Sequence, residues 1–249
     1  MCHRFTPLVG DEVDRVMDYL QAVRQALAEG ACLEAGAPRL FPAGSVPWEA
    51  LDCFPGSPCE VVVAEDGVLK KQETIWGVAV EWRRGLVFNA RLESALRGEG
   101  LWREAMETGR CLVPVRAFYE TRNVEPPSDQ PSLALDASGS AGKGNRKPQY
   151  RFTSPADEAL LLAGLVVEGN RLTVVTTEPN ALMAPIHNRM PLVLSTQEAW
   201  TWLEGVPEAR ALLADRAQVD LAVQELPAPD KTKRGRAVSG PGADQLSLF

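Results

Sequence analysis

The sequence predicts an α+β fold built around mostly antiparallel strands. Many short apolar segments, several rich in Val and Leu, are spread along the chain, and this is typical of strands. A few helical patterns are scattered between them, without the strict strand-helix alternation that a parallel sheet requires. At 249 residues the chain is long enough for one large domain or two small ones.

Amphipathic periodicity predicts the helices. Residues 11–28 carry apolar side chains at helical spacing, with Asp11 as the cap at the start and Gly30 after the end. Residues 93–108 show a second helical pattern, which stops at Gly109. Two further helical patterns lie at 197–203 and 207–214.

Short apolar segments between turn signals predict the strands. The expected strands are Cys59–Ala64, Val68–Leu69, Thr74–Val80, Leu86–Asn89, Cys111–Val115, Phe118–Glu120, Gln149–Thr153, Leu160–Val167, Arg171–Thr176 and Pro191–Leu194. Glu65-Asp66-Gly67 predicts a turn between the first two strands, and Glu168-Gly169-Asn170 predicts a hairpin. The sequence contains no internal repeat.

Pro- and Gly-rich stretches predict the irregular segments. Residues 31–58 contain four prolines, which block regular structure. Residues 122–148 are polar and predict a mobile loop. From Pro227 onward the chain becomes rich in Pro, Gly, Lys and Arg. We therefore expect one domain over residues 1–226 and a disordered tail over 227–249.

Composition excludes several classes of protein. The net charge of −7 and the pI near 5.1 argue against a protein that coats nucleic acid indiscriminately. The cysteine count of 5 is odd and there are only 2 histidines, so we expect neither a disulfide framework nor a metal site. Neither a membrane span nor a secretory signal is found. We expect a cytoplasmic monomer without a cofactor.

The N-terminus, Met1-Cys2-His3-Arg4-Phe5, carries the most unusual chemistry. If Met1 is removed, Cys2 presents an α-amine and a thiol on adjacent carbons. Their reference pKa values are about 7.7–8.0 and about 8.5, so both groups are partly deprotonated near neutral pH. Such a 1,2-aminothiol can attack a carbonyl, and it can condense with an aldehyde to close a five-membered thiazolidine ring.

Polar residues at the ends of apolar strands are further candidates for catalytic residues. Glu120 ends an aromatic-rich strand, where partial desolvation would raise its pKa toward the range useful in acid-base catalysis. His187 lies between two loop prolines, a place unsuited to pure core packing. Asn89 ends another strand, where it can orient a carbonyl or an amine or simply cap a turn.

Taken together, these segments resemble the SOS response-associated peptidase family, also described as abasic-site processing proteins. The resemblance extends over residues 1 to about 205 and rests on motifs in a fixed order. The motifs are Met1-Cys2-x-Arg4-Phe5, Trp76-Gly77, Asn89-Ala90-Arg91-x-Glu93-Ser94, Arg110-Cys111-Leu112-Val113-Pro114, Phe118-Tyr119-Glu120, Thr176-Thr177 with Asn180, and His187-Asn188-Arg189-Met190-Pro191.

The resemblance implies a fold, an activity and roles for individual residues. It implies a barrel-like β core with flanking helices, and a hydrolase that loses Met1 by self-cleavage or through an aminopeptidase. Cys2 would then crosslink covalently to abasic sites in single-stranded DNA and shield the lesion. By position, Asn89 would hold the Cys2 amine, Glu120 would transfer protons, and His187 would act on the sugar hydroxyl or transfer protons.

The resemblance also implies DNA contacts. The expected contact residues are Arg4, Trp76, Arg91, Thr177 and Asn180. Trp82 and several arginines lie in the same part of the chain, and guanidiniums on phosphates with rings on bases are what a single-strand groove requires. The alternative is that the tryptophans pack in the core and the arginines form a solvated face.

The sequence departs from the family pattern at three positions. His3 replaces the usual Gly, Val80 replaces a Pro, and Thr121 replaces the Trp that commonly follows the glutamate. His3 would crowd the lesion pocket or add a second titrating group there.

Two alternative functions remain open from the sequence. A class II glutamine amidotransferase also exposes an N-terminal cysteine, but it requires an Asn-Gly pair that this chain lacks. The second alternative is a non-catalytic DNA-damage adaptor that acts through its tail.

The last five residues form a second motif. Gln245-Leu246-Ser247-Leu248-Phe249 resembles the pentapeptide by which bacterial replication proteins bind the sliding clamp. Leu246, Leu248 and Phe249 would fill an apolar pocket and Gln245 would supply hydrogen bonds, while the polar tail would act as a tether.

Overall fold

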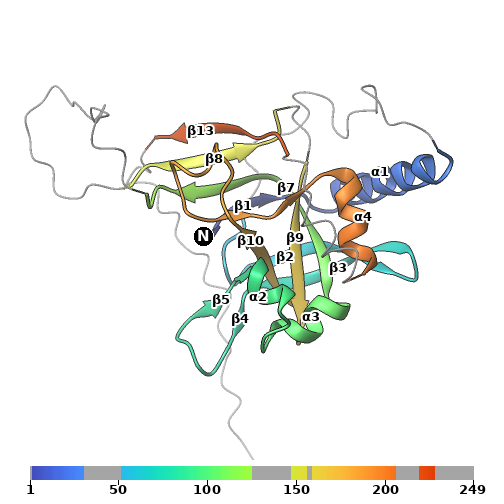
Figure 1. The fold of residues 1–249 in the computed structure, drawn as a ribbon, viewed down its shortest axis with the longest axis horizontal. Coiled ribbons are helices and arrows are strands. Elements are labelled where there is room, and N and C mark those ends of the chain that lie inside the picture. The colour runs from blue at the N-terminus through green and yellow to red at the C-terminus, as the bar shows by residue number, and fades with distance from the viewer. Residues whose placement is uncertain (1, 31–51, 125–146, 156–158, 206–218, 228–249) are drawn as a thin grey trace, which may run out of the picture.

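The computed structural model describes residues 2–30, 52–124, 147–155, 159–205 and 219–227 (Figure 1). The helices are α1 (Asp11–Ala28), α2 (Leu92–Leu96), α3 (Trp102–Thr108) and α4 (Thr196–Glu204). The strands are β1 (Phe5–Pro7), β2 (Pro58–Glu65), β3 (Val68–Trp76), β4 (Val78–Ala79), β5 (Leu86–Val87), β6 (Asn89–Arg91), β7 (Arg110–Thr121), β8 (Gln149–Thr153), β9 (Leu160–Val167), β10 (Arg171–Thr177), β11 (Met190–Pro191), β12 (Val193–Leu194) and β13 (Ala222–Leu226).

The main sheet closes on itself. Its strands follow the order β9, β10, β3, β2 and β7, and β7 pairs again with β9. Strands β8 and β13 continue the sheet beyond β7, and β1 also pairs with β7. Among the described strands, β10 pairs in parallel with β3 and β6, and the other pairs are antiparallel. This confirms the expected α+β fold, with a mostly antiparallel, barrel-like core and flanking helices.

Alternation along the strands creates two apolar clusters. On β7, Cys111 and Val113 lie in a cluster with Cys2, whereas Leu112 lies in a second cluster with residues of α1 and α4. Successive side chains of a strand point to opposite faces, so a continuously apolar strand such as β7 supplies both clusters. In Figure 1, α1 and α4 lie on one side of the sheet, while the β4–β5 hairpin projects from the opposite side.

Helix α1 has the predicted bounds, but its cap is different. Asp11 is the first helical residue rather than the cap. The N-cap position is held by Gly10, which has a φ of 56° and no side chain to accept a hydrogen bond.

The predicted helix over 93–108 is wrong, because the segment forms two helices. Between α2 and α3, Gly98 and Gly100 have φ values of 64° and 51°. This left-handed backbone cannot continue a right-handed helix, and glycine adopts it without steric cost.

Several predicted strands are also divided or joined differently. The two strands expected over 111–115 and 118–120 are one strand, β7. The strand expected over 74–80 is interrupted at Gly77, whose φ is 101° and where a Cβ would lie 3.0 Å from Leu86 Cβ. The segments expected at 86–89 and 191–194 each divide between two short strands, and β13 was not predicted.

Some predictions fall outside the described residues. These are most of the loop over 122–148, the helix over 207–214 and nearly all of the tail, including Gln245, Leu246, Leu248 and Phe249. Within the described ranges, no helix is both long and apolar enough to cross a membrane.

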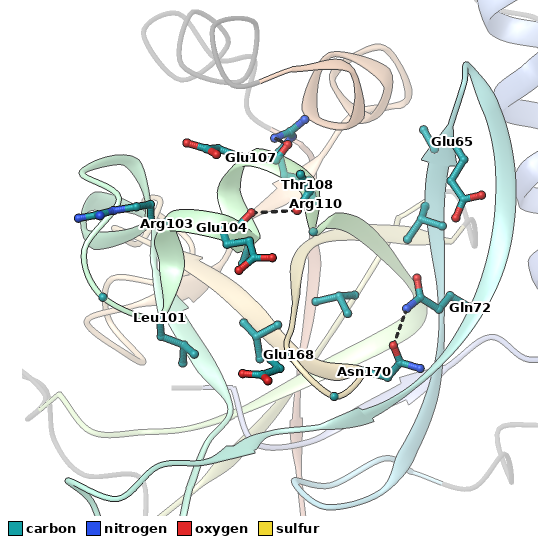
Figure 2. Close-up of a pocket in the computed structure, with 18 residues that line it drawn as sticks. Glu65, Gln72, Leu101, Arg103, Glu104, Glu107, Thr108, Arg110, Glu168 and Asn170 are labelled. Carbon is teal, nitrogen blue, oxygen red and sulfur yellow. Dashed lines mark hydrogen bonds between the residues drawn. The ribbon is translucent and has the colours of Figure 1, made fainter.

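The longest strand, β7, runs from a cavity at its start to the candidate functional residues at its end. Near its start, at Arg110, lies an open polar cavity of about 760 Å³ bordered by α3, the β2–β3 hairpin and the β9–β10 turn (Figure 2). Glu65, Glu104 and Glu168 are among its lining residues. The other end of β7 carries Glu120, and the candidate functional residues meet there.

Candidate active site

The pairing of β1 with β7 brings Cys2 close to Glu120. Phe5 pairs with Phe118, and the Tyr119 N–H donates to the Arg4 carbonyl at 3.0 Å. Cys2 is fully buried, and its Sγ donates to the Arg4 carbonyl at 3.6 Å. Burial, followed by the nearby Glu120 carboxylate, raises the pKa of the Cys2 thiol above its usual range. The chain still carries Met1, so these properties belong to the unprocessed form.

Arg4 holds the N-terminal segment in place. Its Nε donates to Asp52 at 2.8 Å and its Nη1 donates to the Gln149 side chain at 2.7 Å. Its guanidinium also lies 3.9 Å from the centre of the Tyr119 ring. Asp52 accepts a further hydrogen bond from Thr6 Oγ1 at 2.7 Å. These contacts indicate that Arg4 positions the strand next to Cys2, a role separate from the expected DNA contact.

Asn89 contacts Cys2 directly. Strand β6 pairs in parallel with β10, with Asn89 opposite Val174. Asn89 Nδ2 donates to the Cys2 carbonyl at 2.8 Å. The Oδ1 atom of Asn89 is buried and has no hydrogen-bond partner among the described residues. A buried, unpaired acceptor beside the N-terminal cysteine can receive an N–H group from that cysteine.

The pKa of Glu120 is raised, as its position at the end of an aromatic-rich strand predicted. Its side chain is 1% exposed, and burial raises its pKa to about 7. A carboxyl group with this pKa is divided between its acid and base forms near neutral pH. Glu120 can therefore both donate and accept a proton beside Cys2.

His187 is the fourth residue of the candidate site, after Cys2, Asn89 and Glu120. It lies at the end of a turn, where its backbone N–H donates to the Met183 carbonyl at 2.9 Å. Its Nε2 is 3.9 Å from Glu120 Oε2, beyond hydrogen-bond distance. Burial lowers the pKa of His187 to about 4, so the imidazole is neutral near pH 7 and the contact is not an ion pair.

A polar cavity of about 460 Å³ opens beside His187. It is lined by Arg91, Asn123, His187, Asn188 and Arg189. Arg189 is held by the Glu93 carboxylate at 2.7 and 2.9 Å and by the Thr176 carbonyl at 2.7 Å. Arg91 is exposed. Because Glu93 already balances the charge of Arg189, Arg91 is the guanidinium at this cavity that can attract an anion such as a phosphate.

Trp76 does not have the exposure that the expected DNA contact requires. Its side chain is 0% exposed, and its Nε1 donates to the Phe88 carbonyl at 2.8 Å. Its ring packs 4.4 Å from that of Phe5, so no base can stack on it while the core is closed. Trp82, by contrast, is 74% exposed in the β4–β5 hairpin.

Thr177 is the last residue of β10, and Asn180 follows it at the start of the turn that leads to His187. Thr177 pairs with Met190. Asn180 Oδ1 accepts the Met183 N–H at 2.9 Å and caps the turn that leads to His187. The Asn180 side chain therefore has a role within the fold, which is separate from the predicted DNA contact.

Sequence reasoning did not select several residues of this site. They are Asp52, Gln149, Asn123, Asn188 and Arg189. Asn188 and Arg189 belong to the motif that contains His187. Their place in that motif is the sequence signal that could have identified them as site residues. Asp52 and Asn123 lie in segments predicted to be loops, and Gln149 begins a predicted strand. Only the folded chain places the three residues here. The described residues contain no group of three or more side chains suited to holding a metal ion.

Known structures share this fold at low sequence identity. The crystal structure of a phage-related protein from Bordetella bronchiseptica aligns with a TM-score of 0.57 and 20% identity, over 90% of this chain and 94% of that one. A second crystal structure of a protein from Bordetella bronchiseptica aligns with a TM-score of 0.56 and 19% identity, over 91% of this chain and 100% of that one.

Sequence relatives cover part of the chain. Abasic site processing protein YoqW from Bacillus subtilis is 28% identical over 141 residues, which is 51% of this chain and 54% of that protein. Abasic site processing protein YobE, also from Bacillus subtilis, is 28% identical over 125 residues, 47% of this chain and 48% of that protein. The chain thus spans about half the length of these relatives.

The model of the SOS response associated peptidase family matches residues 42–227. This range includes Asn89, Glu120 and His187 and makes up more than half of the chain. The chain therefore belongs to the SOS response associated peptidase family.

Proposed function

We propose that this protein processes abasic sites in single-stranded DNA by forming a covalent bond through Cys2. The observation that carries the proposal is the continuous group formed by Asn89, Cys2, Glu120 and His187. Asn89 donates a hydrogen bond to the Cys2 carbonyl, and Glu120 is near enough to raise the pKa of Cys2 and lies 3.9 Å from His187. The names of the Bacillus subtilis relatives support the same substrate.

The first step is hydrolysis of the Met1–Cys2 peptide bond. Water adds across the bond, Met1 leaves as the free amino acid, and Cys2 becomes the N-terminus. The new amine can donate to Asn89 Oδ1, the buried acceptor that has no partner within the described part of the chain. The partly protonated Glu120 can supply a proton to the leaving amine.

The second step joins Cys2 to the lesion. The ring-opened abasic sugar presents an aldehyde, and the Cys2 amine adds to it and releases water to give an imine. The Cys2 sulfur then adds to the same carbon, the thiol proton moves to the imine nitrogen, and a thiazolidine ring results. Glu120 and the neutral His187 are placed to move these protons.

DNA binding relies on a local surface, because the protein as a whole is negative. The net charge of −7 repels DNA from most of the molecule. Arg91 and Arg189 line the cavity beside His187, and Trp82 is exposed in the β4–β5 hairpin. A phosphate on Arg91 and a base stacked on Trp82 suit an unpaired strand better than a duplex.

The test is intact mass before and after incubation with single-stranded DNA that carries one abasic site. We expect the purified protein to lack Met1 and to gain the mass of the DNA minus one water. Cys2→Ala should abolish the adduct, whereas Cys111→Ala, which changes another fully buried thiol, should retain it. Full crosslinking by a chain that keeps Met1 would exclude the thiazolidine.

The Cys2→Ala result also separates this proposal from its alternatives. A non-catalytic adaptor would bind damaged DNA equally well without Cys2. A glutamine amidotransferase would release ammonia from glutamine and form no DNA adduct.

A further inference from the structure

Asn123 connects the strand of Glu120 with the loop of His187. It lies two residues beyond the end of β7, and its backbone N–H donates to the Ile186 carbonyl at 2.9 Å. Its side-chain Nδ2 lies 2.9 Å from His187 Nε2. Asn123 is thus a direct neighbour of the ring atom that faces Glu120.

Asn188 fixes the orientation of the Asn123 amide. The backbone N–H of Asn188 donates to Asn123 Oδ1 at 3.3 Å. Asn123 Nδ2 in turn donates to Asn188 Oδ1 at 3.3 Å. The reversed amide would place two N–H donors against each other, so Nδ2 is the atom that faces His187.

This orientation determines the tautomer of His187. An amide nitrogen can only donate, so His187 Nε2 must accept. A neutral imidazole carries one proton, which then lies on Nδ1 and donates to the Arg189 carbonyl at 3.0 Å. The Arg189 N–H is also directed at Nδ1, at 3.0 Å, and this contact favours the other tautomer, because a protonated Nδ1 cannot accept from it. The Asn123 amide and the Arg189 N–H therefore compete, and we give the decision to Asn123.

We infer that Asn123 is a positioning residue that holds His187 as a neutral imidazole, protonated on Nδ1 and with Nε2 as a hydrogen-bond acceptor beside Glu120. Both side chains line the 460 Å³ cavity with Arg91. A substrate hydroxyl that enters there can donate to Nε2 in place of Asn123. His187 would then accept a proton that Glu120, 3.9 Å away, can receive in turn.

The low pKa of His187 agrees with this assignment, because burial keeps the ring neutral. The charged and titratable groups around the ring include the N-terminal amine, Glu120, Arg91, Arg189 and His3. The catalytic role of His187 rests on the proposed function, whereas the assignment of its tautomer does not depend on that function.

Nitrogen-15 NMR of the imidazoles measures the tautomer without any substrate. The chain has 2 histidines, so two sets of ring signals are expected, and His3→Ala assigns the remaining set to His187. The wild-type ring should be protonated on Nδ1. Asn123→Ala should shift the ring toward protonation on Nε2, and the isosteric Asn123→Asp should reverse the tautomer, because a carboxylate accepts from Nε2–H.

Gln72→Ala is the matched control, since this amide lies in the distant cavity of Figure 2 and should leave the His187 signals unchanged. A wild-type ring protonated on Nε2 would overturn the inference. So would an Asn123→Ala spectrum identical to that of the wild type. If Asn123→Ala does not fold, Asn123→Asp alone decides between these outcomes.

The rate of DNA capture tests the positioning role. Asn123→Ala should slow adduct formation about tenfold, the effect of one lost hydrogen bond. A shifted tautomer with an unchanged rate would overturn the role of Asn123 in positioning. If the tautomer responds as expected but the wild type captures no DNA, the tautomer assignment stands and the proposed function fails.

Discussion

Asn89 and Cys2 are 87 positions apart in the sequence, yet Asn89 Nδ2 donates to the Cys2 carbonyl at 2.8 Å. The same amide leaves a buried Oδ1 without a hydrogen-bond partner in the part of the chain that the structure describes. The nucleophile is therefore anchored by one end of the Asn89 side chain, and the other end can receive the amine that forms when Met1 leaves.

Asn89→Ala should slow capture of abasic DNA by about 10–10²-fold, because a displacement of about 1 Å can cost that much in rate. Asn89→Asp keeps an acceptor but loses the donor, so it separates the two ends of the side chain. Single-turnover crosslinking measures both rates, and thermal unfolding checks that the variants fold. A wild-type rate in both variants would show that Asn89 does not position Cys2.

Glu120→Gln should slow adduct formation by about 10²–10⁴-fold, the usual value of one proton-transfer residue. Burial raises the pKa of Glu120, so the wild-type rate should show an inflection with pH above the usual range of a carboxyl group, and the variant should lose it. Glu104→Gln, an exposed carboxyl in the distant cavity, is the control. If Glu120 also drives self-cleavage, intact mass should show Met1 retained in the variant.

Glu120 should also make stability depend on pH. Its pKa is raised in the folded chain, so the native state binds more protons than the unfolded state between about pH 4.3 and 7. Stability from this group is therefore lost as pH rises through that range, by about 4 kcal/mol at most. Glu120→Gln should be more stable than the wild type at pH 8 and lose that advantage toward pH 4.

Urea unfolding at pH 5 and pH 8 measures this difference. His187 contributes with the opposite sign, because its lowered folded pKa makes stability fall as pH decreases. Glu120 lies 3.9 Å from His187, so the substitution also changes this contribution, and His187→Ala in both backgrounds removes it from the comparison. An equal wild-type-to-variant gap at the two pH values would contradict the raised pKa of Glu120.

Trp82→Ala should weaken binding of single-stranded DNA by about 1–3 kcal/mol, the value of one base stacked on an aromatic ring. Fluorescence anisotropy with an undamaged oligonucleotide measures the effect without the covalent step. Val68→Ala is the control, because Val68 is 52% exposed at the β2–β3 turn, outside the proposed DNA surface. Equal losses in both variants would mean that Trp82 makes no specific contact.

Arg91→Ala should weaken DNA binding for all sequences and reduce the slope of log affinity against log salt by about 1. The physical reason is the loss of one phosphate contact and the counterion that it releases. Arg103→Ala removes the same charge beside the distant cavity and should leave the slope unchanged. Equal salt slopes in Arg91→Ala and the wild type would place the phosphate elsewhere.

The C-terminal pentapeptide supports a further proposal, that it binds a bacterial sliding clamp. A peptide of residues 235–249 should bind a purified clamp with micromolar affinity, measured by calorimetry. Changing Leu248 and Phe249 to Ala removes two apolar contacts and should abolish binding, whereas changing Lys231 and Lys233 in the full-length chain should have little effect. No detectable binding by the unchanged peptide would end this proposal.

The sequence by itself determined the fold class, the bounds of α1, β8 and β9, and the residue types of the site. These properties are encoded locally, because side-chain spacing along a few turns or a few strand positions reports which face is buried. Motifs in order also indicated the family, which the match over residues 42–227 confirms.

Only the tertiary structure decided which side chains meet. The contacts of Asn89 with Cys2 and of Asn123 with His187 depend on the register of strands far apart in the sequence, and no local pattern specifies it. The same holds for the tryptophans: Trp76 and Trp82 belong to one short segment, yet the turn at Gly77 buries the first and exposes the second. Local sequence fixes what a residue can do, and long-range packing fixes the partner and the solvent with which it does so.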